Sequence, residues 1–276
     1  MKTLIIGADG QLGSQLIKIL PDAIGTARKN GSRHFLDLNH GQTIEDFILK
    51  MQPEVIVNAA ANTNVDKCEE DRVDAFRING TSIKHMVRAA RVVGSYFIHI
   101  STDYVFDGHT GMYNEQDIPN PVDFYGLSKM VGEANALSYD DSIVIRTSGV
   151  YGVKMNFPLF VVRTLKEGGT VKCIDSYYSP IHAKFLAEAV KEISERRIYG
   201  ILNVAGPRIS RYDFANKIME ELDIKTGKIV SAESGGVLKA KRPYDSSLDS
   251  SRAKKLLQTD FDNLKASIKL LGTEVI

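Results

Sequence analysis

The chain has 276 residues and carries 35 Lys and Arg against 34 Asp and Glu, so its formal net charge is +1. This length suffices for a large α/β domain and a smaller lobe, and the balanced charge gives no bias toward nucleic acid or an anionic membrane. The isolated Cys68 and Cys173 and the scattered histidines have neither metal-ligand nor disulfide spacing, so no metal site is predicted. The apolar run after Lys2 is too short for a signal peptide or a membrane span, so we expect a cytoplasmic protein.

A glycine-rich turn follows the first predicted strand, residues 3–6, and precedes a helical pattern over residues 11–20. Strand, glycine-rich turn and helix in this order are the context of a dinucleotide-binding turn, in which backbone N–H groups approach a pyrophosphate. A glycine-rich turn without a ligand is the competing interpretation of this segment alone. The residues assigned to the cofactor here are Gly7, Gly10, Gln11, Leu12 and Gly13.

The second predicted strand, residues 23–26, runs into Arg28 and Lys29. A protein that prefers NAD places Asp or Glu here to accept hydrogen bonds from the ribose hydroxyls. Two cations instead suit a 2′-phosphate, which arginine binds with paired hydrogen bonds. NADPH is therefore favoured, with NADH as the alternative cofactor, and a solvated basic loop is the competing interpretation.

Three small residues, Ala59, Ala60 and Ala61, follow the predicted strand at residues 55–58. A cofactor that lies directly over the end of a strand requires small side chains at that point. Tight packing between helix and sheet explains any single alanine nearly as well. We assign all three residues to the cofactor site.

A hydroxyl, a phenol and an ammonium group follow the next predicted strand, residues 96–100. Thr102 comes just after this strand, and Tyr125 and Lys129 are four residues apart on a predicted helix over residues 125–137, so they share one face. A nearby ammonium stabilises a phenolate and lowers the tyrosine pKa from its usual value of about 10. The pair then acts as a general acid or base on a carbonyl or alcohol, whose oxygen Thr102 can hydrogen-bond.

The alternation of strands and helices predicts a Rossmann-type, doubly wound parallel sheet. Further helices are expected at residues 44–51, 73–93 and 181–194, and further strands at residues 142–146 and 201–204. We assign residues 1–152 and 174–205 to a dinucleotide-binding domain. Residues 153–173 and 206–276 are expected to form a smaller, discontinuous substrate-binding lobe over the carboxyl ends of the strands.

These motifs resemble the extended short-chain dehydrogenase/reductases and, within them, the dTDP-4-dehydrorhamnose reductase family. The most specific string is Ser-Thr-Asp-Tyr-Val-Phe at residues 101–106, and the similarity runs through nearly the whole chain. One position departs from the family: Gly149 stands where a tryptophan that packs on the sugar is common. Other matching segments are residues 7–13, 57–61, 65–67, 125–129, 146–152, 242–243 and 247–249.

The resemblance implies an NADPH-dependent reductase that converts dTDP-4-dehydro-L-rhamnose to dTDP-L-rhamnose. In this family role Tyr125 donates a proton to the carbonyl oxygen, Lys129 holds the nicotinamide ribose, and Thr102 orients the oxygen. The resemblance also places Asp37 and Leu38 at the adenine. Because the family is often dimeric, a homodimer is left open.

Candidate substrate contacts also come from the resemblance. Asp103 and Phe106 would line the sugar site, and Asn156 and Arg242 are candidates for sugar or diphosphate contacts. Arg242 is favoured because a diphosphate needs a cation, although a surface salt bridge explains it equally well. Asn79 often completes a proton relay in the superfamily, with buried polar capping as the competing explanation.

Other cations could contact phosphate, but no sequence feature selects among Lys29, Lys154 and Arg211. Two other functions are weighed against the reductase. One is a non-catalytic dinucleotide-binding regulatory protein that resembles the regulatory subunit of methionine adenosyltransferase. The other is a nucleotide-sugar epimerase or dehydratase, which commonly exceeds this chain in length.

Overall fold

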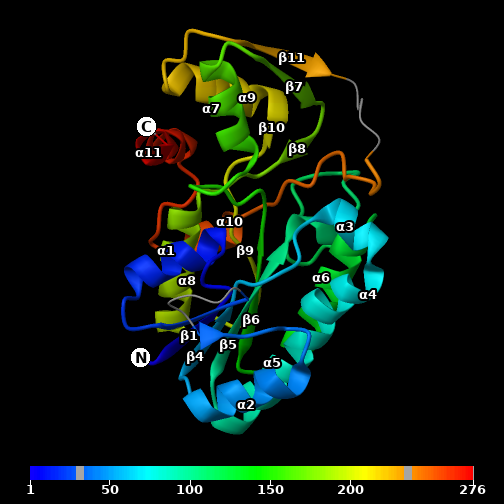
Figure 1. Ribbon diagram of the computed structural model, residues 1–276, viewed down its shortest axis with the longest axis vertical. Coiled ribbons are helices and arrows are strands. Elements are labelled where there is room, and N and C mark those ends of the chain that lie inside the picture. Colours follow the sequence, from blue (N-terminus) through cyan, green and yellow to red (C-terminus); the bar gives the residue numbers. More distant parts are fainter. Residues whose placement is uncertain (29–33, 233–237, 276) are drawn as a thin grey trace.

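The computed structural model describes residues 1–28, 34–232 and 238–275 (Figure 1). Its central sheet consists of seven parallel strands in the order β3-β2-β1-β4-β5-β6-β9. This arrangement confirms the predicted Rossmann-type sheet. The strands are β1 (Thr3–Ile6), β2 (Ile24–Ala27), β3 (His34–Phe35), β4 (Val55–Asn58), β5 (Tyr96–Thr102), β6 (Ser142–Thr147) and β9 (Gly200–Asn203).

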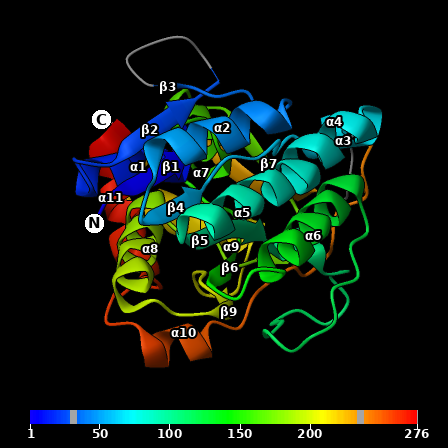
Figure 2. The same cartoon turned by 90° about the horizontal axis from the view of Figure 1, so that it is seen from below.

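Helices cover both faces of the sheet because side chains of a strand point alternately to either side (Figure 2). Ile5 packs with helices α1 and α8 on one face, whereas Leu4 and Ile6 pack with helices α2 and α5 on the other. Strand residues buried on both faces are typical of a parallel sheet. The helices are α1 (Gln11–Ile19), α2 (Gly41–Met51), α5 (Ser82–Val93), α6 (Phe124–Leu137), α8 (Ala183–Arg196) and α10 (Ser251–Leu256).

The helical stretch before β5 is more divided than the single helix predicted over residues 73–93. The structure has α3 (Val65–Glu70), α4 (Arg72–Phe76), a π-helical turn η1 (Arg77–Thr81) and then α5. The side chain of Asp71 accepts a hydrogen bond from the Asp74 N–H, which starts α4 as a separate helix. π-helical turns frequently lie at functional sites, and η1 carries Asn79.

A smaller unit lies beyond the carboxyl ends of the strands, at the top of Figure 1. Its own hydrophobic core contains Val162, Val171, Phe214 and Leu271. In contrast, Ala253 and Leu257, at α10, pack into the core of the large sheet, although the sequence assigns them to the smaller lobe. The division of the chain into two lobes stays a prediction. The elements of the unit are α7 (Phe157–Lys166), β7 (Thr170–Ile174), β8 (Tyr177–Tyr178), β10 (Ile209–Ser210), α9 (Arg211–Glu221), β11 (Lys228–Ala232) and α11 (Leu264–Val275).

Among the described residues, no helix is both long enough and apolar enough to cross a lipid bilayer. Cys68 and Cys173 are both buried free thiols.

Candidate active site

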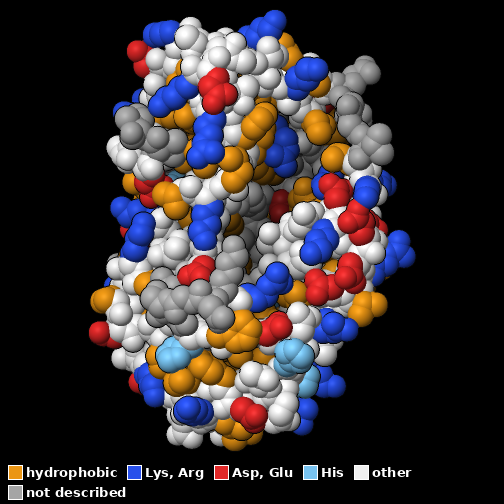
Figure 3. All heavy atoms as spheres, in the orientation of Figure 1, with side chains coloured by type: hydrophobic (Ala, Val, Ile, Leu, Met, Phe, Trp, Pro, Cys, Tyr) orange, Lys and Arg blue, Asp and Glu red, His pale blue; other side chains and the backbone are white. Residues whose placement is uncertain are grey.

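A cavity of about 950 Å³ lies between the carboxyl ends of the strands and the smaller unit. Figure 3 shows the surface hollowed between these two parts. Most of the residues that the sequence assigns to cofactor and substrate line this cavity. They are Gly7, Gly10, Gln11, Leu12, Arg28, Asp37, Leu38, Ala59, Ala60, Ala61, Thr102, Asp103, Tyr125, Lys129 and Asn156.

The glycine turn is built for close approach of the backbone. Gly7 has a φ of +84°, and a Cβ there would lie 2.8 Å from the Ala60 Cα. Gly13 does not line the cavity, but its Cβ would lie 2.2 Å from the Gly7 carbonyl oxygen, so it permits the tight entry into α1. No side chain caps α1 at Gly10, which leaves the first N–H groups of this helix for phosphate oxygens. The turn therefore fits the pyrophosphate of a dinucleotide.

The end of the cavity near β2 holds the residues expected to bind adenosine. Arg28 is exposed and lines the cavity together with Asp37 and Leu38. The Asp37 carboxylate accepts hydrogen bonds from the Asn39 N–H and side-chain amide, both at 3.0 Å, which fixes the local turn. Lys29, the second cation expected here, lies outside the described residues.

The end of β5 and the first turns of α6 bring Thr102, Tyr125 and Lys129 into the same cavity. Asp123 caps α6 by accepting a hydrogen bond from the Gly126 N–H (2.7 Å), which sets Tyr125 in the first turn. The Lys129 Nζ donates to the Ile100 carbonyl oxygen at 2.6 Å.

Burial governs the titration of both catalytic candidates. It raises the pKa of Tyr125, although a hydrogen bond with Thr102 lowers it in part. Burial also lowers the pKa of Lys129 to about 8, against the attraction of Glu133. The sequence predicts that Lys129 lowers the pKa of Tyr125. In the structure burial is instead the largest influence on this pKa, and the phenol keeps its proton at neutral pH.

A buried histidine, to which the sequence assigned no role, adjoins Lys129. The Ala60 N–H donates to Asn58 Oδ1 (3.2 Å), which directs Asn58 Nδ2 to His99 Nδ1 at 3.2 Å. The Nδ1 atom is therefore an acceptor, and the neutral ring carries its proton on Nε2, 3.4 Å from the Lys129 Nζ. Burial first, and then the charge of Lys129, hold the pKa of His99 well below its usual range.

Asp103 is a buried carboxylate whose oxygens are already engaged. Its Oδ1 accepts from the Thr102 hydroxyl (3.0 Å), and its Oδ2 accepts from Ser148 (2.7 Å) and Ser246 (2.6 Å). Burial raises the pKa of Asp103, while these hydroxyls lower it. In the structure Asp103 thus orients the Thr102 hydroxyl, a role that the sequence does not indicate.

Tyr178 occupies the space beside Gly149, where the family commonly has tryptophan. Gly149 has a φ of +49°, and a Cβ there would lie 2.6 Å from the Tyr178 ring. Both residues line the cavity. An aromatic ring from β8 therefore forms the wall at this position.

Four other residues that the sequence singles out have local partners. Asn156 caps α7 by accepting from the Leu159 N–H (2.9 Å) and donates to the Gly152 carbonyl (2.8 Å). Phe106 is buried and does not line the cavity, and its ring stacks on Tyr113 with centroids 4.3 Å apart.

Arg242 is also absent from the lining of the cavity, because its guanidinium pairs with Asp66 at 3.1 Å. Asn79 binds the backbone of Asn62, accepting from its N–H (2.8 Å) and donating to its carbonyl (3.0 Å). A further bond joins Asn79 to Ser128 (3.0 Å), so its amide ties a segment of the cavity wall to α6.

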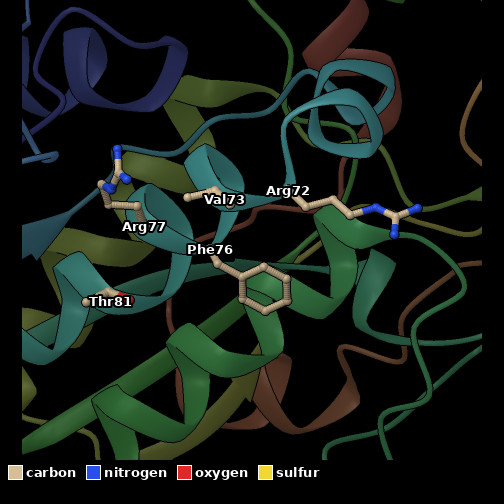
Figure 4. A pocket seen from close by; sticks show the side chains of 5 residues that line it. All are labelled: Arg72, Val73, Phe76, Arg77 and Thr81. Atoms are coloured by element: carbon tan, nitrogen blue, oxygen red, sulfur yellow. The ribbon is translucent and has the colours of Figure 1, made fainter.

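A second, shallow depression lies on α4 and η1, lined by Val73, Phe76 and Thr81 between two arginines. Figure 4 shows Arg72 and Arg77 pointing away from each other. The Arg72 guanidinium lies 3.8 Å from the centroid of the Phe124 ring. None of the predicted site residues belongs to this depression.

The fold and the large cavity together define the class of protein. A doubly wound parallel sheet carries a glycine turn after its first strand, and a threonine, a tyrosine and a lysine share the cavity with that turn. Short-chain dehydrogenase/reductases use these parts to move a hydride and a proton between a dinucleotide and a carbonyl or alcohol. The protein is an oxidoreductase of this class.

Comparison with known proteins identifies the family. The family model described as the RmlD substrate binding domain matches residues 1–275. The dTDP-4-dehydrorhamnose reductase of Aggregatibacter actinomycetemcomitans is 34% identical over 275 residues, covering 90% of each chain. The chain therefore belongs to this family, that of the dTDP-4-dehydrorhamnose reductases.

Solved structures agree with this assignment. The crystal structure of a hypothetical dTDP-4-dehydrorhamnose reductase from Sulfolobus tokodaii matches with a TM-score of 0.91 and 50% identity, covering 95% of this chain and 97% of that one. The dTDP-4-dehydrorhamnose reductase of Bacillus anthracis, solved in complex with NADP, matches with a TM-score of 0.91 and 27% identity. That match covers 99% of this chain and 100% of the other.

Proposed function

We propose that the protein is an NADPH-dependent reductase that converts dTDP-4-dehydro-L-rhamnose to dTDP-L-rhamnose. One observation carries the proposal: Thr102, Tyr125 and Lys129 line the same cavity as the glycine turn. A proton donor and a hydride donor must both reach one carbonyl group, and this cavity holds the proton donor together with the turn that suits a dinucleotide.

The chain supplies the proton and the orientation of the substrate, while bound NADPH supplies the hydride. Tyr125 gives its proton to the carbonyl oxygen, and its raised pKa keeps the phenol protonated, as reduction requires. Thr102 hydrogen-bonds with Tyr125 and positions the phenol in the cavity. Asp103 fixes the direction of the Thr102 hydroxyl, since it accepts the proton of that group.

NADPH is the proposed cofactor. The uncapped start of α1 suits the pyrophosphate, and Arg28 at the end of β2 suits a 2′-phosphate. The reductase relative solved with NADP supports the same choice. NADH is the alternative that a direct comparison of affinities would decide.

The two rival functions have less support. A regulatory protein without catalysis has no need of the threonine, tyrosine and lysine that this cavity holds. If the protein were an epimerase or dehydratase, we would expect relatives of comparable identity over nearly the whole chain to have that activity. The relatives described above are instead named as reductases.

A homodimer and a cytoplasmic location complete the proposal. The free thiols of Cys68 and Cys173 support a reducing compartment. The homodimer rests on the family resemblance alone, and sedimentation of the purified protein would test it.

The proposed activity is tested by mixing purified protein, NADPH and dTDP-4-dehydro-L-rhamnose and following the absorbance of NADPH. We expect a loss of absorbance that Tyr125→Phe abolishes while it still binds NADPH. Binding of NADPH by the wild-type protein without turnover would favour the regulatory function instead.

A further inference from the structure

We propose that Arg211, at the start of α9, binds the diphosphate of the nucleotide-sugar substrate. The inference rests on the proposed function, since that function requires an anionic substrate in the large cavity. Arg211 lines this cavity from the smaller unit. The sequence did not distinguish Arg211 from the other cations that it offered for phosphate.

The Arg211 side chain is held in place by aromatic rings next to its guanidinium and by a hydrogen bond from its Nε atom. The guanidinium carbon lies 4.5 Å from the centroid of the Tyr178 ring and 5.3 Å from that of Phe157. The Nε atom donates to the Ser176 hydroxyl at 3.2 Å. Stacking uses the face of the guanidinium and leaves its terminal N–H groups to form bonds in the plane.

The charge of Arg211 has no acidic partner within residues 1–28, 34–232 and 238–275, where no carboxylate forms an ion pair with it. The four terminal N–H donors of this cavity-lining residue therefore have no carboxylate to neutralise them. A phosphate group provides the oxygens that such a planar fork binds best. The arrangement is that of a site prepared for an anion.

Arg208 provides an internal comparison, because it is built in the same way but is neutralised. Its guanidinium lies 3.9 Å from the centroid of the Tyr177 ring. Its Nε and Nη2 atoms both bond to Asp245 at 2.8 Å, and Arg208 does not line the cavity. Two arginines three residues apart thus stack on neighbouring tyrosines, and only Arg211 lacks a carboxylate.

Arg242, favoured from the sequence for the diphosphate, is less suited to this role in the structure. It pairs with Asp66 at 3.1 Å and also donates to the Ala240 carbonyl at 3.1 Å. Asp66 in turn accepts hydrogen bonds from the Lys239 and Ala240 N–H groups, so the pair is part of a backbone connection. Moving Arg242 to a phosphate would break this connection.

Arg211 shares the cavity with the proton donor Tyr125. Its charge acts on the buried Tyr104 phenol, whose pKa burial raises and Arg211 lowers. The Tyr104 ring in turn lies 5.8 Å from that of Tyr125. Arg211 therefore acts on a side chain that adjoins the proton donor.

Calorimetric titration of the protein with dTDP, in the presence of saturating NADPH, tests this assignment. Loss of a bidentate charged contact costs about 1.5–3 kcal/mol, so Arg211→Gln should bind dTDP about 10- to 100-fold more weakly. Arg211→Lys retains the charge but not the fork, and it should fall between the two. Thymidine, which carries no phosphate, should bind all variants equally.

Arg208→Lys is the matched control and should bind dTDP as the wild-type protein does. Arg242→Gln should also retain its affinity, and unchanged NADPH binding will show that each variant is folded. The inference is overturned if Arg211→Gln and Arg211→Lys bind dTDP like the wild-type protein, if Arg242→Gln alone loses affinity, or if the wild-type protein does not bind dTDP. Binding of dTDP through Arg211 without turnover of dTDP-4-dehydro-L-rhamnose would instead reject the proposed function and leave the diphosphate site standing.

Discussion

Burial shifts the pKa values of Tyr125 and Lys129 in opposite directions within one cavity, upward for the phenol and to about 8 for the ammonium. Both shifts favour the neutral form of the group, because a charge is poorly solvated there. His99 Nε2 lies 3.4 Å from Lys129 Nζ in the same buried site. The charge of Lys129 is therefore sensitive to pH near neutrality.

This sensitivity predicts the pH dependence of the reaction. The ammonium exists below its pKa, so kcat for reduction should be constant at lower pH and fall as the pH rises through about 8. Steady-state assays over a pH series, with saturating substrates, will measure the fall.

Lys129→Arg is the control for the origin of this fall, since arginine stays charged up to a pH of about 12. The kcat that Lys129→Arg retains should not fall as the pH rises through about 8. A wild-type kcat that stays constant to about pH 10 would contradict the assignment of the fall to Lys129.

We expect Arg28 to determine the preference for NADPH over NADH. Its substitution by alanine should weaken NADPH by about 10- to 100-fold, because a charge-assisted contact to the 2′-phosphate is lost. NADH binding should hardly change. Fluorescence titration with both cofactors measures the ratio, and Lys50→Ala, an exposed cation on α2, is the control. Equal losses for the two cofactors would remove Arg28 from the phosphate site.

Gly149 and Tyr178 should show coupled effects on stability. Gly149→Ala places a Cβ 2.6 Å from the Tyr178 ring and should destabilise the fold by about 1–3 kcal/mol. The same change in a Tyr178→Leu background should cost less, because the ring is gone and only the strain of the positive φ remains. Urea unfolding of the four proteins gives the coupling energy, and strictly additive effects would show that the two residues act independently.

At the level of elements, the sequence predicts the sheet and the helices on its faces because their apolar periodicities are strong. The division of the helix before β5 is not predicted, since the π-helical turn at Arg77–Thr81 depends on tertiary contacts. Gly132 on α6 packs so closely on η1 that a Cβ would lie 2.3 Å from the Asn79 carbonyl oxygen. The periodicity of one segment contains no information on such a contact.

Gly132→Ala should therefore destabilise the protein by about 1–3 kcal/mol, as overpacking against backbone does. Gly80→Ala is the matched control on the other side of this contact, because the nearest atom to its Cβ would be in the Val131 side chain, at 3.0 Å, and the Ser128 carbonyl oxygen would be at an ordinary contact distance of 3.6 Å. Urea unfolding should give the smaller loss for Gly80→Ala. Equal stability of Gly132→Ala and the wild-type protein would mean that α6 and η1 are not in close contact.

Across the whole molecule, the sequence predicts which residues share the site when they belong to one short motif. It does not predict contacts between residues that only the folded chain brings together. Thr102, Tyr125, Lys129 and the glycine turn have characteristic spacings, and all of them except Gly13 line the large cavity. The partners of Asp103 are 45 and 143 residues away in sequence, at Ser148 and Ser246, where no spacing rule applies. The pairing of Arg242 with Asp66 likewise depends on the return of a distant segment.

The most direct test of the account follows the hydride. The protein is incubated with dTDP-4-dehydro-L-rhamnose and NADPH that carries deuterium at the transferred position, and the product is analysed by mass spectrometry and NMR. Direct reduction predicts dTDP-L-rhamnose with a single deuterium at C4, formed by the wild-type protein and not by Tyr125→Phe. Product without deuterium, or equal formation of labelled product by Tyr125→Phe, would contradict proton donation by Tyr125 to a carbonyl reduced in this cavity.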